Sequence, residues 1–172
     1  MSTCLELTHL PTENNASTQI NNDHHEKKFA ELTQREKRSL IFHLLYAAES
    51  FDYQLSLYAI VDNFNRGFDL DIPLESEFVF TAQTIIETRD ALDEAVKPLL
   101  SNWRFDRLGV CTKLILRYAM WELQNTDTIP SIIINEAIEL AKCFAEKDAY
   151  KFINGILDKA VTESDVLPAD VE

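Results

Sequence analysis

The chain has 172 residues, of which 46% are apolar and 26% are charged, as in an ordinary globular domain. This length suffices for one domain with a sizeable core and is short for two. The formal net charge of −13 argues at first sight against nucleic-acid binding, because lysine and arginine drive phosphate contacts. No apolar run approaches the roughly 20 residues of a membrane-spanning helix, and the N-terminus lacks a secretory signal pattern. A cytoplasmic protein with no membrane partner is therefore expected.

The acidic residues are concentrated at the two ends of the chain. Residues 1–26 and 163–172 together hold eight Asp or Glu and no Lys or Arg, which leaves a net charge of −5 for residues 27–162. We therefore predict a disordered polar and acidic N-terminal extension over 1–26, a folded domain over 27–162, and an acidic tail over 163–172. Phosphate contacts are local, because the Debye length is only about 8 Å at physiological salt. Net charge alone thus does not exclude RNA.

Apolar residues recur at helical spacing throughout the central domain. Thr33 and Glu36 have the spacing of a capping box and predict the start of the first helix, and Gly67 is a natural helix stop. The predicted helices are, in order, one from Thr33, then residues 53–66, 77–99 with a kinked last turn at Pro98, 107–124, one from Pro130, and 148–161. Useful period-two alternation and tandem repeats are absent from the sequence. The prediction is a single all-α domain.

Catalytic and metal-binding patterns find little support. The sequence holds none of the glycine-rich phosphate loops, the Gly-x-Ser-x-Gly nucleophile motif or the His-Glu-x-x-His zinc motif. Cys4, Cys111 and Cys143 are far apart and form no Cys-x-x-Cys pair, which argues against a zinc site. Glu136 and Glu139 are three residues apart, a spacing more typical of a solvated helix face than of an acid/base pair. We predict neither an enzyme nor a bound metal or cofactor.

A basic cluster opens the first helix. Residues 27–38 hold five Lys or Arg and two Glu, a local excess of positive charge. Arg35 and Arg38 lie three apart and so project from one side of the helix, with Lys37 beside them. The guanidinium group suits phosphates and base edges. For a lone cluster of this size, an ordinary charged outer face is the alternative interpretation.

A second candidate region opens the last helix. Lys151 offers a phosphate contact, while Tyr150 or Phe152 could stack on an unpaired base. Phe152 also fits the apolar period of this helix, so spacing alone favours a core position for it. Periodicity and charge together predict a helical binding module but do not identify its ligand.

The C-terminal third carries a dense pattern of residue types at fixed spacings, and this pattern begins earlier in the chain, at Trp103. The pattern consists of Trp103, Arg107-Leu108, Ile115 to Arg117, Glu122-Leu123, Pro130, Asn135 to Ala137, Glu139 to Lys142, Lys151-Phe152 and Asn154-Gly155. It resembles the signature of NusB-type transcription antitermination factors, with Trp121 in place of the usual Tyr. The resemblance covers about residues 33–161 and is densest from Trp103 onward.

This resemblance implies a compact all-α fold of two packed helical bundles. It also implies binding of the boxA element of ribosomal RNA transcripts together with the ribosomal protein NusE, which links the RNA to RNA polymerase and other Nus factors without catalysing a reaction. Some members of the family self-associate, so a homodimer is a further expectation. The residues that match the family's RNA surface are Arg35, Arg38, Asp148, Lys151 and Phe152, with Lys37 as a neighbour.

The departures from the family pattern leave alternatives open. Gln34 and Glu36 occupy positions that are often Arg, and Thr112 stands where Asp is common. Fewer basic contacts predict weaker RNA binding without the partner protein. One alternative is a protein-only adaptor that has lost selective RNA binding, and another is a purely structural helical protein. A NusB-like domain also precedes some ribosomal RNA methyltransferases, but the ten residues after Thr162 are too few for a catalytic domain.

Overall fold

A computed structural model describes residues 28–101 and 103–166, with side chains to Glu163. Within these residues the fold is entirely helical and has no strand, which confirms the predicted all-α class. The helices are η1 (Phe29–Glu31), α1 (Gln34–Ser50), α2 (Leu57–Phe68), α3 (Glu77–Glu87), α4 (Arg89–Val96), η2 (Lys97–Leu99), η3 (Phe105–Arg107), α5 (Val110–Asn125), α6 (Pro130–Phe144) and α7 (Ala149–Val166), where η marks a 3₁₀ helix. The extension predicted for residues 1–26 lies outside the described residues.

The start of α1 is the capping box that the sequence predicts. The Thr33 hydroxyl accepts a hydrogen bond from the Glu36 backbone N–H at 3.2 Å, and the Glu36 carboxylate accepts one from the Thr33 N–H at 2.8 Å. Two of the free donors at the helix N-terminus are thereby satisfied. This geometry fixes where the side chains of the first turn project.

The predicted bounds of α2 are wrong at both ends. The helix begins at Leu57, capped by Ser56, because Tyr53 lies in the left-handed region at φ 57° and cannot start a right-handed helix. It also continues through Gly67 and ends at a left-handed Asp69 with φ 49°. Aspartate tolerates this conformation nearly as asparagine does, so the glycine is not needed as the stop.

The single long helix predicted over 77–99 is divided into α3 and α4. The break falls at Thr88, whose φ of −95° and ψ of 7° are not helical. Its hydroxyl donates to the Thr84 carbonyl at 2.7 Å, and such back-bonding bends helices. The last turn around Pro98 is a 3₁₀ helix, as the proline predicts. Two later bounds also differ, since α5 starts at Val110 and α7 continues to Val166.

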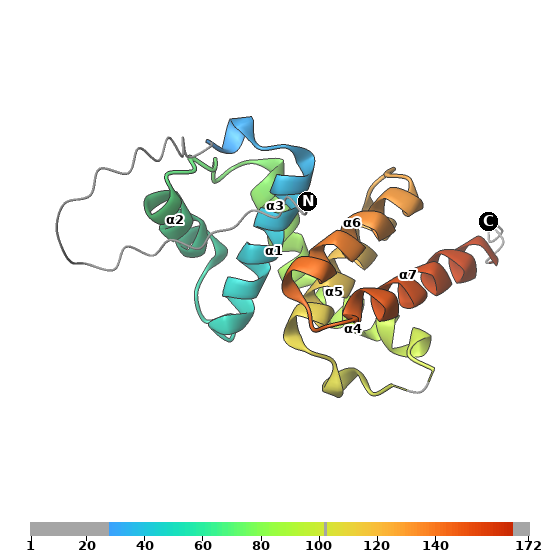
Figure 1. Cartoon of the computed structure of the whole chain (residues 1–172). Helices are drawn as coiled ribbons and strands as arrows, with labels where there is room; N and C mark the ends of the chain where they lie inside the picture. Colours follow the sequence, from blue (N-terminus) through green and yellow to red (C-terminus); the bar gives the residue numbers. More distant parts are fainter. Residues whose placement is uncertain (1–27, 102, 167–172) are drawn as a thin grey trace, which may run out of the picture.

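Two hydrophobic cores meet along α1, in agreement with the two packed bundles that were predicted (Figure 1). The smaller core joins α1 to α2 and α3, and Leu40 and Leu44 of α1 are fully buried in it. The larger core joins α1 to α4, α5, α6 and α7, and takes Ile41 and Leu45 from the neighbouring face of α1. In Figure 1, α1 and α3 lie between α2 on one side and α5, α6 and α7 on the other. Apolar residues around most of its circumference thus place α1 inside the molecule.

An arginine fixes the far end of α1 to the larger bundle. Arg117 of α5 is 8% exposed and binds Asp93 of α4 through two hydrogen bonds of 2.6 and 2.8 Å. It also donates to Glu49 of α1 at 2.9 Å and to the Tyr53 hydroxyl at 3.1 Å. Tyr53 in turn donates to Glu49, and Arg89 covers its ring at 4.5 Å. We call Arg117, Asp93, Glu49 and Tyr53 the Arg117 network.

Candidate nucleic-acid interface

Arg35 and Arg38 leave the first turns of α1 on the side that faces the larger bundle. Arg35 reaches α6 and binds Glu136, with its Nη2 at 2.7 Å and its Nε at 3.2 and 3.3 Å from the carboxylate oxygens. Arg38 reaches α5 and binds Glu122 in the same two-pronged way, at 2.9 and 3.1 Å. Both predicted cations are therefore held by carboxylates of other helices. Glu136, predicted to lie on a solvated face, instead has a side chain only 12% exposed.

The two arginines differ in their access to solvent. The Arg35 side chain is 42% exposed, whereas the Arg38 side chain is 17% exposed and its partner Glu122 is 11% exposed. Burial lowers the pKa of Arg38, but the hydrogen bond and charge of Glu122 outweigh it and raise the pKa. The hydrogen bond that Arg35 donates to Glu136 likewise raises the pKa of Arg35. Both side chains stay cationic, and Arg35 is the easier of the two for a phosphate to reach.

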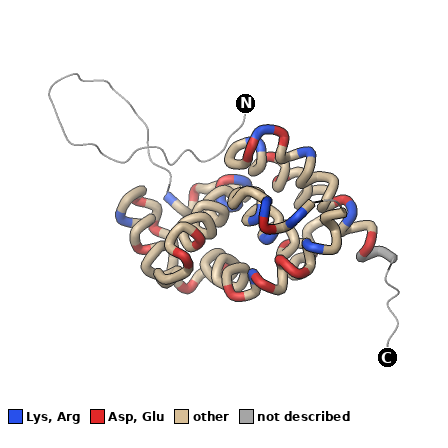
Figure 2. Tube along the Cα trace, turned by 90° about the horizontal axis from the view of Figure 1, so that it is seen from below, with Lys and Arg blue, Asp and Glu red and all other residues tan. Residues whose placement is uncertain are grey.

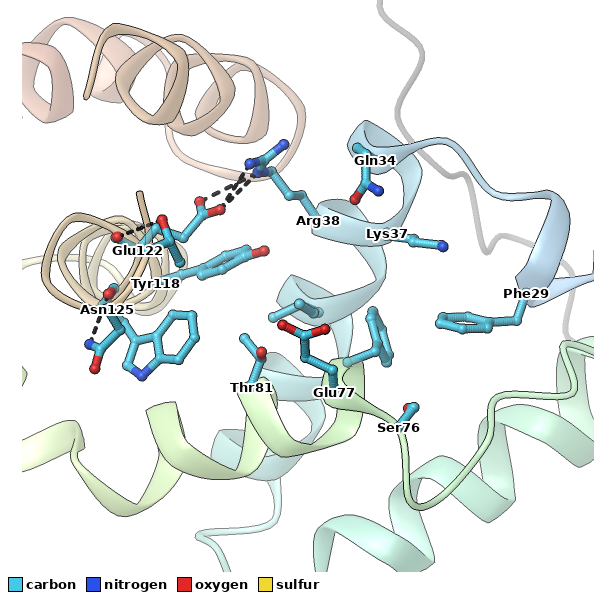
Figure 3. A pocket seen from close by; sticks show the side chains of 14 residues that line it. Phe29, Gln34, Lys37, Arg38, Ser76, Glu77, Thr81, Tyr118, Glu122 and Asn125 are labelled. Carbon is cyan, nitrogen blue, oxygen red and sulfur yellow. Dashed lines mark hydrogen bonds and ion pairs between the residues drawn. The ribbon is translucent and has the colours of Figure 1, made fainter. Parts of the chain in front are cut away.

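Lys37 points away from the two arginines. Its ammonium lies 4.9 Å from the centre of the Phe29 ring in η1, and Figure 3 shows it directed toward that ring while Arg38 turns to Glu122. Cation–π contacts of this kind are weak at exposed sites. Lys37 thus turns away from the carboxylates that hold the arginines, although it lines one groove with Arg38.

A groove of about 530 Å³ lies between α1, α3 and α5, next to Arg38. Lys37, Arg38, Glu77, Tyr118 and Glu122 contribute its polar atoms (Figure 3). Burial, together with the charge of Glu122, raises the pKa of Tyr118, so its phenol stays neutral. The groove therefore offers both charges and a hydroxyl to a ligand, beside the Arg38–Glu122 pair.

The second predicted cluster lies where α6 passes into α7. Asp148 immediately precedes α7 in the left-handed conformation, at φ 68°, and its carboxylate forms an ion pair of 2.8 Å with Lys151 in the first turn. Both side chains are more than half exposed. The hydrogen bond that Lys151 donates to Asp148 raises the pKa of Lys151. An acceptor and a donor thus stand side by side at the surface.

Aromatic rings surround this pair. Phe152 is half-buried, packs against the larger core and lies edge-to-face with Trp103 at 5.6 Å between ring centres. The half-buried Tyr150 ring has Lys142 and Lys151 at 5.7 and 5.6 Å from its centre. Phe152 therefore has contacts on the core side and an aromatic neighbour at the surface. We call Asp148, Tyr150, Lys151, Phe152 and Trp103 the junction cluster.

The two groups of predicted residues lie along one seam between α1 and α6. Arg35 contacts Glu136 near the start of this seam, and Phe42 stacks on Phe144 at 4.7 Å and 18° near its end. Both pairs advance in the same direction, so α1 and α6 run parallel. Phe42 is two helical turns beyond Arg35, about 10 Å along the axis. Among the interactions described for residues 28–101 and 103–166, none joins the arginines directly to the junction cluster.

Thr112 explains one departure from the family pattern. It is 3% exposed in the first turn of α5, and its hydroxyl donates to Glu146 at 2.9 Å. Glu146 lies between α6 and α7 and fills the space beside Gly109, where a methyl group would meet the carboxylate at 1.5 Å. This contact joins α5 to the connection between α6 and α7 and needs a hydroxyl donor at position 112.

Sequence reasoning missed the partners of the basic residues. The carboxylates Glu122 and Glu136 are 84 and 101 residues from Arg38 and Arg35 along the chain, and no local spacing signals the pairing. Trp103 belongs to the recognised pattern, but nothing in the sequence placed its ring against Phe152. Arg117 also belongs to the pattern, and its burial among acids was not foreseen.

Basic and acidic residues are interleaved along the helices and do not separate into opposite faces (Figure 2). Within the described ranges, no group of three or more His, Cys, Asp or Glu side chains is placed to hold a metal ion. In the same part of the chain, no helix is both long and apolar enough to span a membrane.

Known proteins resemble this chain over most of its length. The profile of the NusB family matches residues 35–162. The transcription antitermination protein NusB of Staphylococcus carnosus is 38% identical over 128 residues, which cover 73% of this chain and 97% of that protein. The protein of the same name from Psychromonas ingrahamii is 41% identical over 112 residues, covering 63% and 74%. The solved structure of T. maritima NusB aligns with a TM-score of 0.66 at 28% identity, covering 77% of this chain and 92% of that one.

Fold and sequence together define an all-helical protein of the transcription antitermination class. The chain belongs to the NusB family. The resemblance in its C-terminal pattern is thereby confirmed, and so is the fold that this resemblance implied.

Proposed function

We propose that the protein binds boxA-type single-stranded RNA of ribosomal RNA transcripts together with the ribosomal protein NusE, and so tethers nascent RNA to RNA polymerase and other Nus factors. Membership of the NusB family is the observation that carries this proposal. The seam between α1 and α6 supports it, because exposed cations and half-buried aromatic rings lie at its two ends. The interface would be made by Arg35, Arg38, Asp148, Lys151 and Phe152, with Lys37 beside them.

Each end of the seam suits a different part of the RNA. Arg35 can exchange Glu136 for a phosphate oxygen, since its side chain is already 42% exposed and guanidinium binds phosphate in the same forked geometry. At the junction cluster, Phe152 can stack on an unpaired base, and the Asp148 carboxylate can accept from a base amino group. A strand along the seam would thus place its backbone near α1 and a base near α7.

The carboxylate partners weaken this interface when the protein is alone. A phosphate must displace Glu136 or Glu122 from the arginines, and each displaced carboxylate stays nearby as a negative charge. Because few phosphates are contacted, few counterions are released from the RNA, and the RNA affinity of the isolated protein should fall less steeply with salt concentration. The partner protein then adds contacts that the isolated chain lacks.

A protein-only adaptor is the second candidate function. The observation in its favour is that both arginines are already held by carboxylates within the fold. In this alternative the partner protein binds along α3, α4 and α5, beside the groove, and the arginine pairs serve only to hold α1 against the larger bundle.

Fluorescence anisotropy with a labelled boxA-like RNA of about 12 nucleotides and a scrambled control tests these candidates. The measurement is made with and without NusE, for the native protein and for Arg35→Ala/Arg38→Ala. Arg66→Ala is the matched control, because Arg66 lies on α2, is 70% exposed and also forms an ion pair. RNA binding should be sequence-selective, strengthened by NusE, lost in the double variant and kept in the control.

NusE binding without selective RNA binding at low salt would instead establish the protein-only adaptor. Sedimentation of the protein with and without boxA-like RNA then tests the predicted homodimer, since a dimer that uses the seam should dissociate when RNA binds.

A further inference from the structure

Trp103 exposes an unusual amount of its indole ring. It is 63% exposed and lies in the connection between η2 and η3. Trp121, by contrast, is half-buried on α5 and lines the groove. Tryptophan is on average well buried in folded proteins, because its ring removes a large apolar area from water. An indole left mostly in solvent is therefore a candidate for a contact made outside the chain.

The backbone at Trp103 is tied to the larger core. Its N–H donates to the Leu100 carbonyl at 2.9 Å, and Leu100 is 5% exposed in that core. The exposed Arg104 and Asp106 side chains that follow bind each other through two hydrogen bonds of 3.0 and 2.7 Å. The hydrogen bond to Leu100 restricts the backbone that carries the indole, which lowers the entropy lost when a ligand packs on the ring.

Phe152 lies directly beside this ring. The two ring centres are 5.6 Å apart and the planes meet at 62°, an edge-to-face arrangement. Such a contact uses the edge of one ring and leaves most of the indole surface available. Trp103 therefore extends the aromatic surface of α7 beyond the helix, on the side where Phe152 projects.

We propose that Trp103 is a base-stacking residue of the RNA interface and takes an unpaired base adjacent to the one at Phe152. This inference rests on the proposed RNA-binding function and deepens it. An RNA strand is the occupant because cations also lie at the first turn of α7. Lys142 and Lys151 are 5.7 and 5.6 Å from the centre of the Tyr150 ring, and they would face the phosphates of a strand that passes this end of the helix. Alternating aromatic and cationic groups are the pattern by which proteins hold single strands.

The test compares Trp103→Ala and Trp103→Phe with the native protein, using the labelled boxA-like RNA in the presence of NusE. Trp103→Ala should weaken RNA binding about tenfold, and Trp103→Phe should weaken it less because a ring remains. Tyr58→Ala is the matched control, since Tyr58 is 56% exposed on α2, outside the helices assigned to RNA or to NusE. It should bind RNA as the native protein does.

Two further measurements separate stacking from a structural role. RNA should quench the indole fluorescence of the native protein, and the quenching should disappear in Trp103→Phe, which retains only Trp121. A series of RNAs with one abasic site each should include a position whose loss weakens the native protein but not Trp103→Ala. Circular dichroism confirms that each variant is folded.

The outcomes distinguish this inference from the function on which it rests. A native protein that binds no RNA, even with NusE, overturns both. Native RNA binding that Trp103→Ala leaves within twofold, without quenching, overturns the role of Trp103 alone. Loss of NusE binding in Trp103→Ala with RNA affinity unchanged also overturns it, and would place the indole in a protein interface.

Discussion

The two ends of α1 carry the same chemistry in different surroundings. At its C-terminal end, Arg117 is 8% exposed and binds two carboxylates and a phenol in the Arg117 network. At its N-terminal end, Arg35 is 42% exposed and binds Glu136. Arg38, at 17%, lies between these extremes.

The difference teaches that exposure decides what an arginine–carboxylate pair can do. Breaking a buried pair leaves an uncompensated charge and costs much, whereas an exposed pair contributes little and exchanges easily. The C-terminal end of α1 is therefore suited to holding the bundles together. The N-terminal end is suited to releasing a cation to a ligand.

The largest expected effect is the loss of stability in Arg117→Ala. Removing the guanidinium leaves Asp93 and Glu49 in a buried site without a cation, which should lower the free energy of unfolding by about 3–5 kcal/mol. Urea unfolding followed by circular dichroism measures this change. Arg35→Ala is the comparison and should cost less, because only one carboxylate loses its partner and the Arg35 side chain is already 42% exposed. Equal losses in the two variants would remove the distinction between the two ends of α1.

A smaller loss is expected for Arg38→Ala. Glu122, whose side chain is 11% exposed, would keep its charge without its partner, at a cost of about 1–3 kcal/mol. The double variant Arg38→Ala/Glu122→Gln should recover part of this loss, because the amide no longer carries the buried charge. The same unfolding experiment checks both. A stability as low as that of Arg117→Ala would place Arg38 with the structural arginines.

Above pH 10, the pH dependence of stability should reflect the Arg117 network. Burial and the hydrogen bond to Glu49 raise the pKa of Tyr53 to about 12, above the usual value of about 10 in the unfolded chain. Between these values the folded protein binds more protons than the unfolded chain, so stability is fully present below pH 10 and falls as pH rises toward 12.

Unfolding of native protein and Tyr53→Phe at several pH values tests this. The slope above pH 10 should be shallower in Tyr53→Phe but not zero, since Tyr118 also has a raised pKa. An unchanged slope would mean that the Arg117 network does not raise the pKa of Tyr53.

The smallest expected effect is a gain in RNA affinity for Glu136→Gln. The pair joins a 42% exposed arginine to a 12% exposed carboxylate and is worth about 1 kcal/mol, so removing the competing charge should strengthen RNA binding by at most about fivefold. Anisotropy at low salt measures this gain, with Glu139→Gln as the control on the same helix. Weaker binding in Glu136→Gln would show that Glu136 positions Arg35 and does not compete with the RNA.

The sequence predicts the fold well where local chemistry decides it. The capping box at Thr33 and the apolar face of α1 follow from spacing alone, and the two bundles follow from the recognised family pattern. The predictions fail where several residues compete for one role. Gly67 looked like a helix stop, yet Asp69 takes the left-handed position. The break at Thr88 depends on a side chain bonding to its own helix, which no periodicity reveals.

The candidate site divides in the same way. The sequence predicts which cations and rings matter, because Arg35, Arg38 and Phe152 stand at recognisable positions. It cannot predict that Glu136 and Glu122 hold the two arginines, since these contacts depend on how α1 packs against α5 and α6. The sequence also cannot predict the solvent exposure of these side chains, and exposure is what distinguishes Arg117 from Arg35.

The presence of α1 in both cores affects the newborn chain. α1 is complete at Ser50, while α7, which helps to close the larger core, begins at Ala149. At synthesis rates of about 5–20 residues per second, α1 leaves the ribosome on the order of 10 s before α7. During that delay Ile41 and Phe42 lack their final neighbours, and a chaperone that recognises apolar helices would find its target there. Slower translation after residue 50 should therefore lengthen this vulnerable interval.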